Sequence, residues 1–189
     1  MTKHDLAGFI KQFEYYKMLG EKTFLQLSDE KLFWQYNNQS NSIAMIVTHL
    51  SGNMLSRWTN FLTSDGEKSW RNRDAEFENY LTTRQEVLQT WDAGWNCLFA
   101  TLKSLTEEDF EKEILIRNQK HSVLEAISRQ LAHYPYHIGQ IVFLGKMICN
   151  DNWTSLSIPK GNSSTYNEAK FAKPSQKVHF TDEFLTKKD

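Results

Sequence analysis

Four stretches of the chain carry hydrophobic residues at intervals of three and four, which is the spacing of an amphipathic α-helix. They run from about residue 5 to 27, 43 to 62, 84 to 102 and 123 to 147. Each begins at or next to a residue type that caps helix N-termini, in order Asp5, Ser42, Thr83 and Ser122. At the last two, a glutamate three residues further on completes a capping box. The pattern therefore predicts an all-α four-helix bundle.

Shorter elements are expected between these helices. Ser28 and Thr106 each precede acidic residues, as at the start of a short helical turn. Residues 113–123 fit a small extended or hairpin segment, and Pro135 lies inside the last long helix. Because proline removes a helical hydrogen bond, a kink is expected there.

The end of the chain has a different character. After Asn150 the helical period stops, so residues 150–189 are expected to form an irregular tail. Trp153 and residues 156–159 are its expected anchors on the bundle. No linker divides the sequence, which predicts a single domain over residues 1–189.

The composition excludes several function classes. The 189 residues carry a net charge of −1 with dispersed Lys and Arg, unlike a nucleic-acid-binding surface. No apolar run approaches the ~20 residues of a membrane span. The two cysteines, Cys97 and Cys149, form neither a disulfide framework nor a CxxC zinc motif. We therefore expect a cytoplasmic protein without nucleic-acid or membrane partners.

The candidate chemistry lies in three histidines. His133 and His137 are four residues apart on the last predicted helix, so both imidazoles can face one ion. His49 lies within the second predicted helix, and bundle cores can bring such residues together. Three imidazoles without a carboxylate leave a fourth position for water or substrate on a zinc-like ion. A hydrogen-bonded pair of core histidines is the alternative interpretation of the His133–His137 spacing.

Further polar residues stand near these histidines along the helices. Asn53 and Arg57 continue the His49 face by one and two turns and can contact a substrate. Arg57 can equally pair with an acidic residue of the following turn. Gln140, three residues after His137, can orient a ligand or water, or form a hydrogen bond between helices.

Two other features leave alternatives open. Arg71 and Arg73 can grip carboxylates of an anionic cofactor, or be held by the acidic residues Asp74 and Glu76 of their own loop. Cys97 lies beside the core stripe of its helix and is expected to be a small hydrophobic residue rather than a nucleophile.

The histidine pattern resembles the DinB/YfiT-like superfamily of four-helix-bundle metalloproteins. The resemblance spans nearly the whole chain and is also carried by residues 52–58 (GNMLSRW), 70–74 (WRNRD), 136–141 (YHIGQI) and 158–161 (IPKG), which look like one uncharacterised bacterial branch. It implies zinc or nickel held by His49, His133 and His137, and a homodimer. Relatives of known activity are transferases or isomerases that use a low-molecular-weight thiol.

The resemblance favours a metal-dependent enzyme acting on a small molecule, foremost a thiol-dependent S-transferase of a detoxification or stress type. Two alternatives stay open. The first is a metal-binding stress-response protein without catalysis, and the second is a hydrolase that activates metal-bound water.

Overall fold

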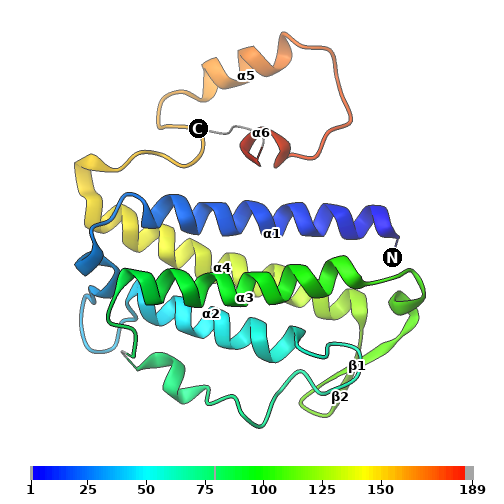
Figure 1. Ribbon diagram of the computed structural model, residues 1–189. Helices are drawn as coiled ribbons and strands as arrows, with labels where there is room; N and C mark the ends of the chain where they lie inside the picture. Colours follow the sequence, from blue (N-terminus) through cyan, green and yellow to red (C-terminus); the bar gives the residue numbers. More distant parts are fainter. Residues whose placement is uncertain (1, 79, 186–189) are drawn as a thin grey trace.

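The computed structural model describes residues 2–78 and 80–185. Four long helices form the bundle, as the sequence predicts: α1 (Lys3–Phe24), α2 (Ile43–Trp58), α3 (Arg84–Ser104) and α4 (Val123–Cys149). α2 packs mainly against α3, and α1 mainly against α4. Figure 1 shows that α2 and α3 run in the same direction, opposite to α1 and α4.

The helices begin where their caps predict, with one difference. The side chains of Ser42, Thr83 and Ser122 each accept a hydrogen bond from the third backbone N–H of their helix. Helix α1 instead begins after Thr2, and Asp5 is not its N-cap. The Asp5 carboxylate accepts a hydrogen bond from the Thr2 N–H at 2.9 Å, which completes a capping box. An acidic side chain inside the first turn also interacts favourably with the positive end of the helix.

Helix α2 ends earlier than its hydrophobic pattern suggests. The backbone turns extended at Thr59 and left-handed at Asn60 (φ 50°), so the helix stops at Trp58. Because α2 and α3 are parallel, the chain must travel back along the bundle before α3 begins. This crossover, residues 59–83, contains the short helix η2 (Asp74–Phe77), which packs against α2.

The small elements predicted between the helices are present. They are the short helices η1 (Asp29–Phe33) and η3 (Glu108–Glu111), and a hairpin of β1 (Glu113–Ile116) and β2 (Gln119–Ser122). The antiparallel register places Ile116 opposite Gln119, so a two-residue turn joins the strands. Helix α4 continues without interruption through Pro135; the expected kink stays a prediction.

The largest fully buried side chains of the core are aromatic. Trp58, Trp91, Trp95 and Tyr134 are at most 2% exposed. The Tyr134 hydroxyl accepts a hydrogen bond from Trp58 Nε1 at 3.0 Å, which satisfies both polar groups. A Cβ at Gly94 would lie 2.8 Å from a backbone atom of Ser51. Gly94 therefore allows α2 and α3 to approach closely.

The tail is more ordered than the sequence suggests. It contains η4 (Asn150–Asn152), α5 (Ser163–Phe171) and α6 (Asp182–Leu185), so the expectation of an irregular segment is wrong over these residues. No residue of α5 is buried, which explains why no hydrophobic period marked it. α6 lies on α1, where Lys11 pairs with Asp182 at 2.6 Å and Tyr15 packs on Phe184 (Figure 1). Trp153 packs near Gly145 of α4, as an anchor should.

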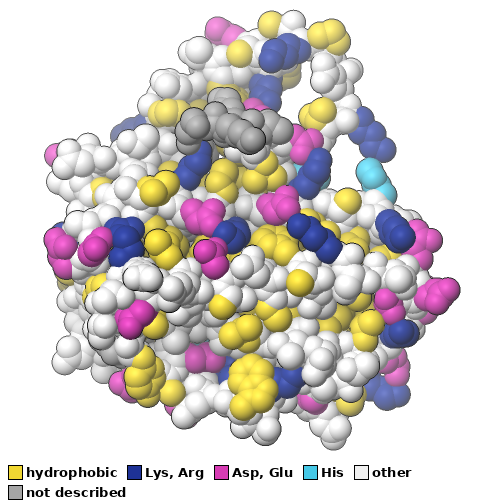
Figure 2. All heavy atoms as spheres, in the orientation of Figure 1, with side chains coloured by type: hydrophobic (Ala, Val, Ile, Leu, Met, Phe, Trp, Pro, Cys, Tyr) yellow, Lys and Arg dark blue, Asp and Glu magenta, His cyan; other side chains and the backbone are white. Residues whose placement is uncertain are grey.

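The surface carries charges of both signs. On the face drawn in Figure 2, Lys and Arg side chains alternate with Asp and Glu, and hydrophobic side chains lie between them. Within residues 2–78 and 80–185, no helix combines the length and apolar character needed to cross a membrane.

Candidate metal centre

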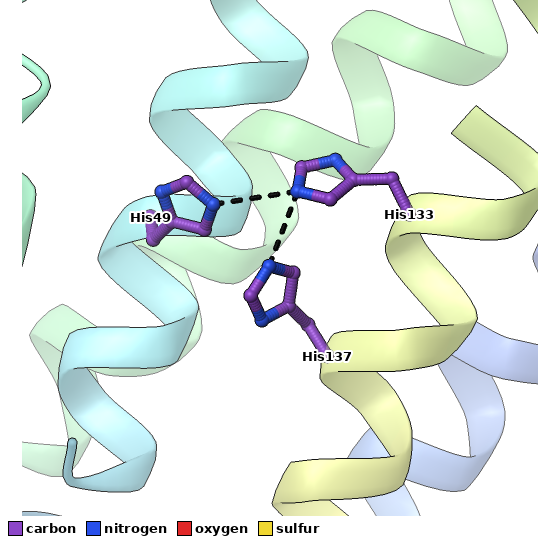
Figure 3. A group of neighbouring side chains, drawn as sticks. All are labelled: His49, His133 and His137. Carbon is purple, nitrogen blue, oxygen red and sulfur yellow. Dashed lines mark hydrogen bonds between the residues drawn. The ribbon is translucent and has the colours of Figure 1, made fainter. Parts of the chain in front are cut away.

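Three histidines from two helices converge on one point (Figure 3). His49 comes from the middle of α2, whereas His133 and His137 come from successive turns of α4. The Nε2 atom of His133 lies 3.4 Å from Nε2 of His49 and 3.1 Å from Nε2 of His137. His49 is buried, and the other two are half-buried. The bundle thus brings the three predicted residues together.

The opposite nitrogen of His49 is fixed by a buried carboxylate. Glu76, in η2, lies with Oε2 at 2.9 Å from His49 Nδ1. A proton on Nδ1 is then donated to Glu76, which leaves the Nε2 lone pair facing the cluster. A Cβ on Gly52, one turn beyond His49, would overlap the Glu76 carboxylate, so glycine makes room for this contact.

The other two rings are oriented in the same way by glutamines. His133 Nδ1 lies 3.2 Å from Gln130 Oε1, and His137 Nδ1 lies 2.8 Å from Gln140 Oε1. Each amide oxygen accepts the Nδ1 proton and places the Nε2 lone pair inward. All three imidazoles therefore present the same kind of atom to the same point.

This arrangement fits a bound cation. Three inward lone pairs repel one another in the absence of positive charge. A tetrahedral ion about 2.0–2.1 Å from each nitrogen would separate the nitrogens by about 3.3 Å, close to the two spacings from His133 Nε2. All three ligand atoms lie within 4.8 Å of one another. Burial, together with the neighbouring His137 and His49, lowers the pKa of His133 to about 3. Burial also lowers the pKa of His137. The rings of His133 and His137 are thus held in the neutral form that binds metals.

Glu76, like Gln130, is a site component that the sequence does not predict. Glu76 is only 6% exposed, and its carboxylate also accepts two hydrogen bonds from Arg71. Arg71 Nε lies 2.7 Å from Glu76 Oε1, and Arg71 Nη2 lies 2.9 Å from Glu76 Oε2. Burial raises the pKa of Glu76, but the hydrogen bonds from His49 and Arg71 outweigh it, so the pKa is lowered overall. The prediction that the loop's own acids hold Arg71 is confirmed for Glu76.

The other predicted site residues have mixed outcomes. Asn53 and Arg57 line the pocket next to the histidines, and Asn53 also accepts a hydrogen bond from Tyr134 at 3.1 Å. Arg57 donates to the Gly66 carbonyl and pairs with Glu67 at 3.2 Å, as its alternative interpretation predicted. Gln140 contacts the His137 ring of its own helix rather than a residue of another helix.

The pocket in front of the Nε2 atoms has a volume of about 410 Å³. Its walls come from α2, the crossover and α4, and the hairpin turn contributes Arg117. The ring of Phe77 stacks on His49 with centroids 4.9 Å apart, so it covers one side of the cluster. Tyr136, which is 63% exposed, lines the pocket from α4.

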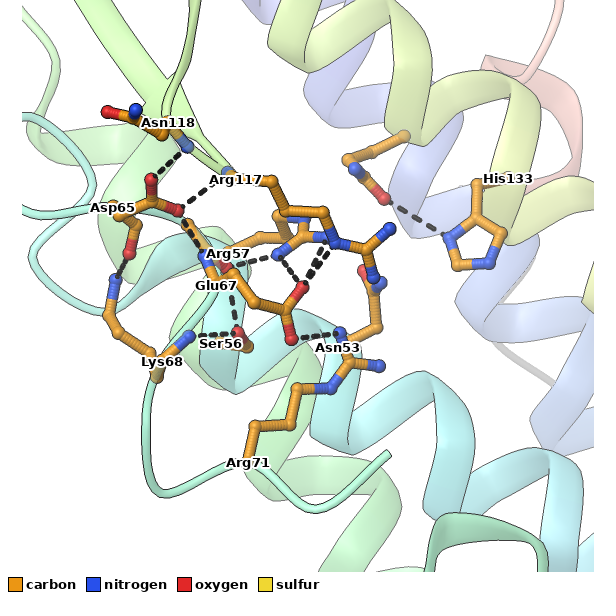
Figure 4. A network of polar contacts seen from close by, with 12 residues as sticks. Asn53, Ser56, Arg57, Asp65, Glu67, Lys68, Arg71, Arg117, Asn118 and His133 are labelled. Carbon is orange, nitrogen blue, oxygen red and sulfur yellow. Dashed lines mark hydrogen bonds and ion pairs between the residues drawn. The ribbon is translucent and has the colours of Figure 1, made fainter. Parts of the chain in front are cut away.

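A network of ion pairs borders this pocket (Figure 4). Three guanidinium groups surround the Glu67 carboxylate: Arg57 at 3.2 Å, Arg117 at 3.0 Å and Arg71 at 3.9 Å. Burial raises the pKa of Glu67, but Arg57 and Arg71 lower it by more, so the pKa lies below its usual value. Glu67 thus stays ionised in the folded protein.

Glu67→Gln tests this network through the pH dependence of stability. Because the folded-state pKa of Glu67 is depressed, its contribution is complete above the unfolded-state pKa of about 4.3 and is lost as the pH falls through the folded-state pKa. We expect the variant to melt about 2–4 °C below the wild type at pH 7. The difference should shrink as the pH falls below about 4. A constant difference from pH 7 to pH 3 in thermal melts would contradict this assignment.

The fold and the cluster together define a four-helix bundle with three histidines that could hold a metal ion. Residues 1–162, which include all four long helices, match a family described as a protein of unknown function, DUF1572. The chain belongs to this DinB-like family. No curated protein and no solved structure matches the chain significantly.

Proposed function

We propose that this protein is a divalent-metal-dependent S-transferase that joins a low-molecular-weight thiol to an electrophilic small molecule. The observation that carries the proposal is the three Nε2 atoms facing a pocket of about 410 Å³. Among the described residues, no fourth His, Cys, Asp or Glu completes the cluster. Zinc and nickel suit three imidazole ligands with one position left for substrate.

The protein's own residues prepare this site. Glu76, Gln130 and Gln140 hold the Nδ1 protons, so the three rings keep their orientation when no substrate is present. Phe77 excludes water from one side of His49. A bound divalent ion would supply a Lewis acid that lowers the pKa of a substrate thiol.

The sulfur of the reaction has to come from a substrate. Cys97 lies in α3 with its Sγ 3.6 Å from the hydroxyl of Thr59, and it does not line the pocket. In the proposed reaction the thiol loses its proton to solvent and its sulfur forms a bond to an electrophilic carbon. The leaving group departs with the electron pair of the bond that breaks.

Two further properties belong to the proposal. We place the protein in the cytoplasm, because Cys97 and Cys149 are both free thiols. We also propose a homodimer, on the strength of the resemblance to DinB/YfiT-like proteins.

The test is a conjugation assay with zinc-loaded and nickel-loaded protein. A panel of electrophiles is offered with several small thiols, and product is followed by mass spectrometry. We expect His133→Ala to reduce conjugation to the uncatalysed rate, whereas His4→Ala, which changes an exposed histidine in the first turn of α1, should keep full activity.

Each alternative has its own outcome. Equal conjugation by the wild type and His133→Ala removes the transferase proposal. Ester or amide hydrolysis that needs His133, without thiol consumption, would instead indicate a hydrolase. Metal binding without turnover of any substrate would indicate a metal-binding protein without catalysis.

A further inference from the structure

The pocket in front of the histidine cluster is lined by positive charge. Within the described chain its lining includes five arginines and no aspartate or glutamate. Two carboxylates lie behind this lining, and both are already engaged. Glu67 pairs with Arg57, Arg71 and Arg117, and Glu76 pairs with Arg71 and His49. The guanidinium groups therefore outnumber the carboxylates that can neutralise them.

Two of the arginines have no carboxylate partner among residues 2–78 and 80–185. Arg129 lies one helical turn before His133 on α4 and lines the pocket on the same face. Arg73 lies over the ring of Phe77 at 5.4 Å, and Phe77 itself stacks on His49. Both exposed groups thus line the pocket beside the histidines with their hydrogen-bond donors available.

Arg117 is placed at the pocket by a strained backbone. It occupies the hairpin turn with φ 54°, and Asn118 follows with φ 58°. Such a turn favours asparagine or glycine, so an arginine there is unfavourable. The Asp65 carboxylate compensates for this strain, because it accepts hydrogen bonds from the backbone N–H of Arg117 at 2.8 Å and of Asn118 at 2.7 Å (Figure 4). An arginine at a strained position beside a pocket indicates a role for its side chain.

Arg57, a buried residue in the pocket wall, also indicates that the pocket holds a ligand. Arg57 is 5% exposed, and its Nε has no hydrogen-bond partner within the described residues. A buried donor without a partner is unfavourable unless a ligand or water reaches it. This donor belongs to a residue that lines the same pocket.

We propose that Arg73, Arg117 and Arg129 form an arginine rim that binds a carboxylate or phosphate group of the substrate or of the thiol. Guanidinium groups bind both anions through paired hydrogen bonds, and the rim places the anion beside the three Nε2 atoms. The inference rests on the proposed function only in taking the bound anion to be part of a substrate.

Calorimetric titration of zinc-loaded protein tests the rim directly. Succinate and inorganic phosphate serve as separate probes, and the tighter of the two identifies the preferred anion. We expect Arg73→Gln and Arg129→Gln each to weaken binding about tenfold, and the double variant about a hundredfold. Lys146→Gln removes one positive charge from α4 outside the pocket and should leave binding unchanged. Equal affinity in the wild type and the double variant would overturn the proposal, as would equal weakening by Lys146→Gln.

Arg117→Gly separates function from folding. Glycine adopts the left-handed conformation without strain, which offsets the loss of the exposed Arg117–Glu67 pair, so the melting temperature should stay within about 2 °C of the wild type. Anion affinity should nevertheless fall about tenfold. Unchanged affinity in a variant of undiminished stability would remove Arg117 from the rim.

Two comparisons distinguish failure of the rim from failure of the proposed function. Succinate or phosphate binding should survive in His133→Ala, whereas its complete loss would place the anion on the metal ion and overturn the rim. In the conjugation assay, Arg129→Gln should lower kcat/KM for N-acetylcysteine about tenfold but leave its methyl ester unaffected. An equal decrease for both thiols would contradict recognition of the carboxylate. Arginine-dependent anion binding without any conjugation would refute the transferase and leave the rim intact.

Discussion

Replacing His133 by alanine is expected to abolish metal binding. The wild type should carry about one zinc or nickel ion per chain after loading, and the variant none above background. His133 contributes the central nitrogen, at 3.4 Å from His49 Nε2 and 3.1 Å from His137 Nε2. Two imidazoles alone offer too few ligands for a tight site. Elemental analysis by mass spectrometry after gel filtration measures the metal content.

The same variant should remain folded. His133 is half-buried and faces the pocket rather than the hydrophobic core, so the metal-free wild type and the metal-free variant should have similar melting temperatures. His4→Ala is the matched control, because it removes an exposed imidazole away from the cluster. Full metal retention by His133→Ala, or equal metal loss in His4→Ala, would contradict the assignment of the three histidines as the metal site.

The histidine cluster could be anticipated because its geometry is helical. The spacing of His133 and His137 and the apolar stripes around His49 are local properties, and helix packing supplies the rest. Gln130 and Gln140, three residues from their histidines, follow the same spacing. The periodicity that relates Gln140 to His137 also relates Gln130 to His133, so spacing alone can indicate both contacts.

Glu76 could not be anticipated as a site residue in this way. Glu76 reaches His49 from the crossover, which has no hydrophobic period to fix its path across α2. The parallel arrangement of α2 and α3 determines that path, and it depends on packing over the whole bundle (Figure 1). Gly52 was a usable local signal, since a glycine inside a helix often marks a close approach.

The helices of the tail could not be predicted from hydrophobic periodicity. α5 buries no residue, so no amphipathic stripe existed to reveal it. α6 lies on α1 through single contacts such as Lys11 with Asp182, which leave no periodic trace in the sequence. Hydrophobic periodicity marks elements that bury one face, so it does not reveal elements that bury little surface.

Glu76→Ala is expected to weaken both the metal site and the fold. Without the carboxylate, His49 loses the acceptor that fixes its Nδ1 proton, and metal affinity should fall about 10–100-fold. Arg71, whose side chain is 2% exposed, also loses its closest partner. Breaking a buried ion pair from one side destabilises by about 3–5 kcal/mol. Competitive chelator titration measures the affinity, and chemical denaturation of the metal-free protein measures the stability.

A second substitution separates the two effects of Glu76. In the Glu76→Ala background, the buried Arg71 keeps only its longer contact with Glu67 at 3.9 Å. Arg71→Met removes this poorly compensated charge, so the free energy of unfolding should recover by about 1–4 kcal/mol. Metal affinity should stay low, because His49 still has no acceptor for its Nδ1 proton. Recovery of both properties together would mean that Glu76 acts on the metal site only through the fold. Recovery of stability alone would place Glu76 in the site as the residue that orients His49.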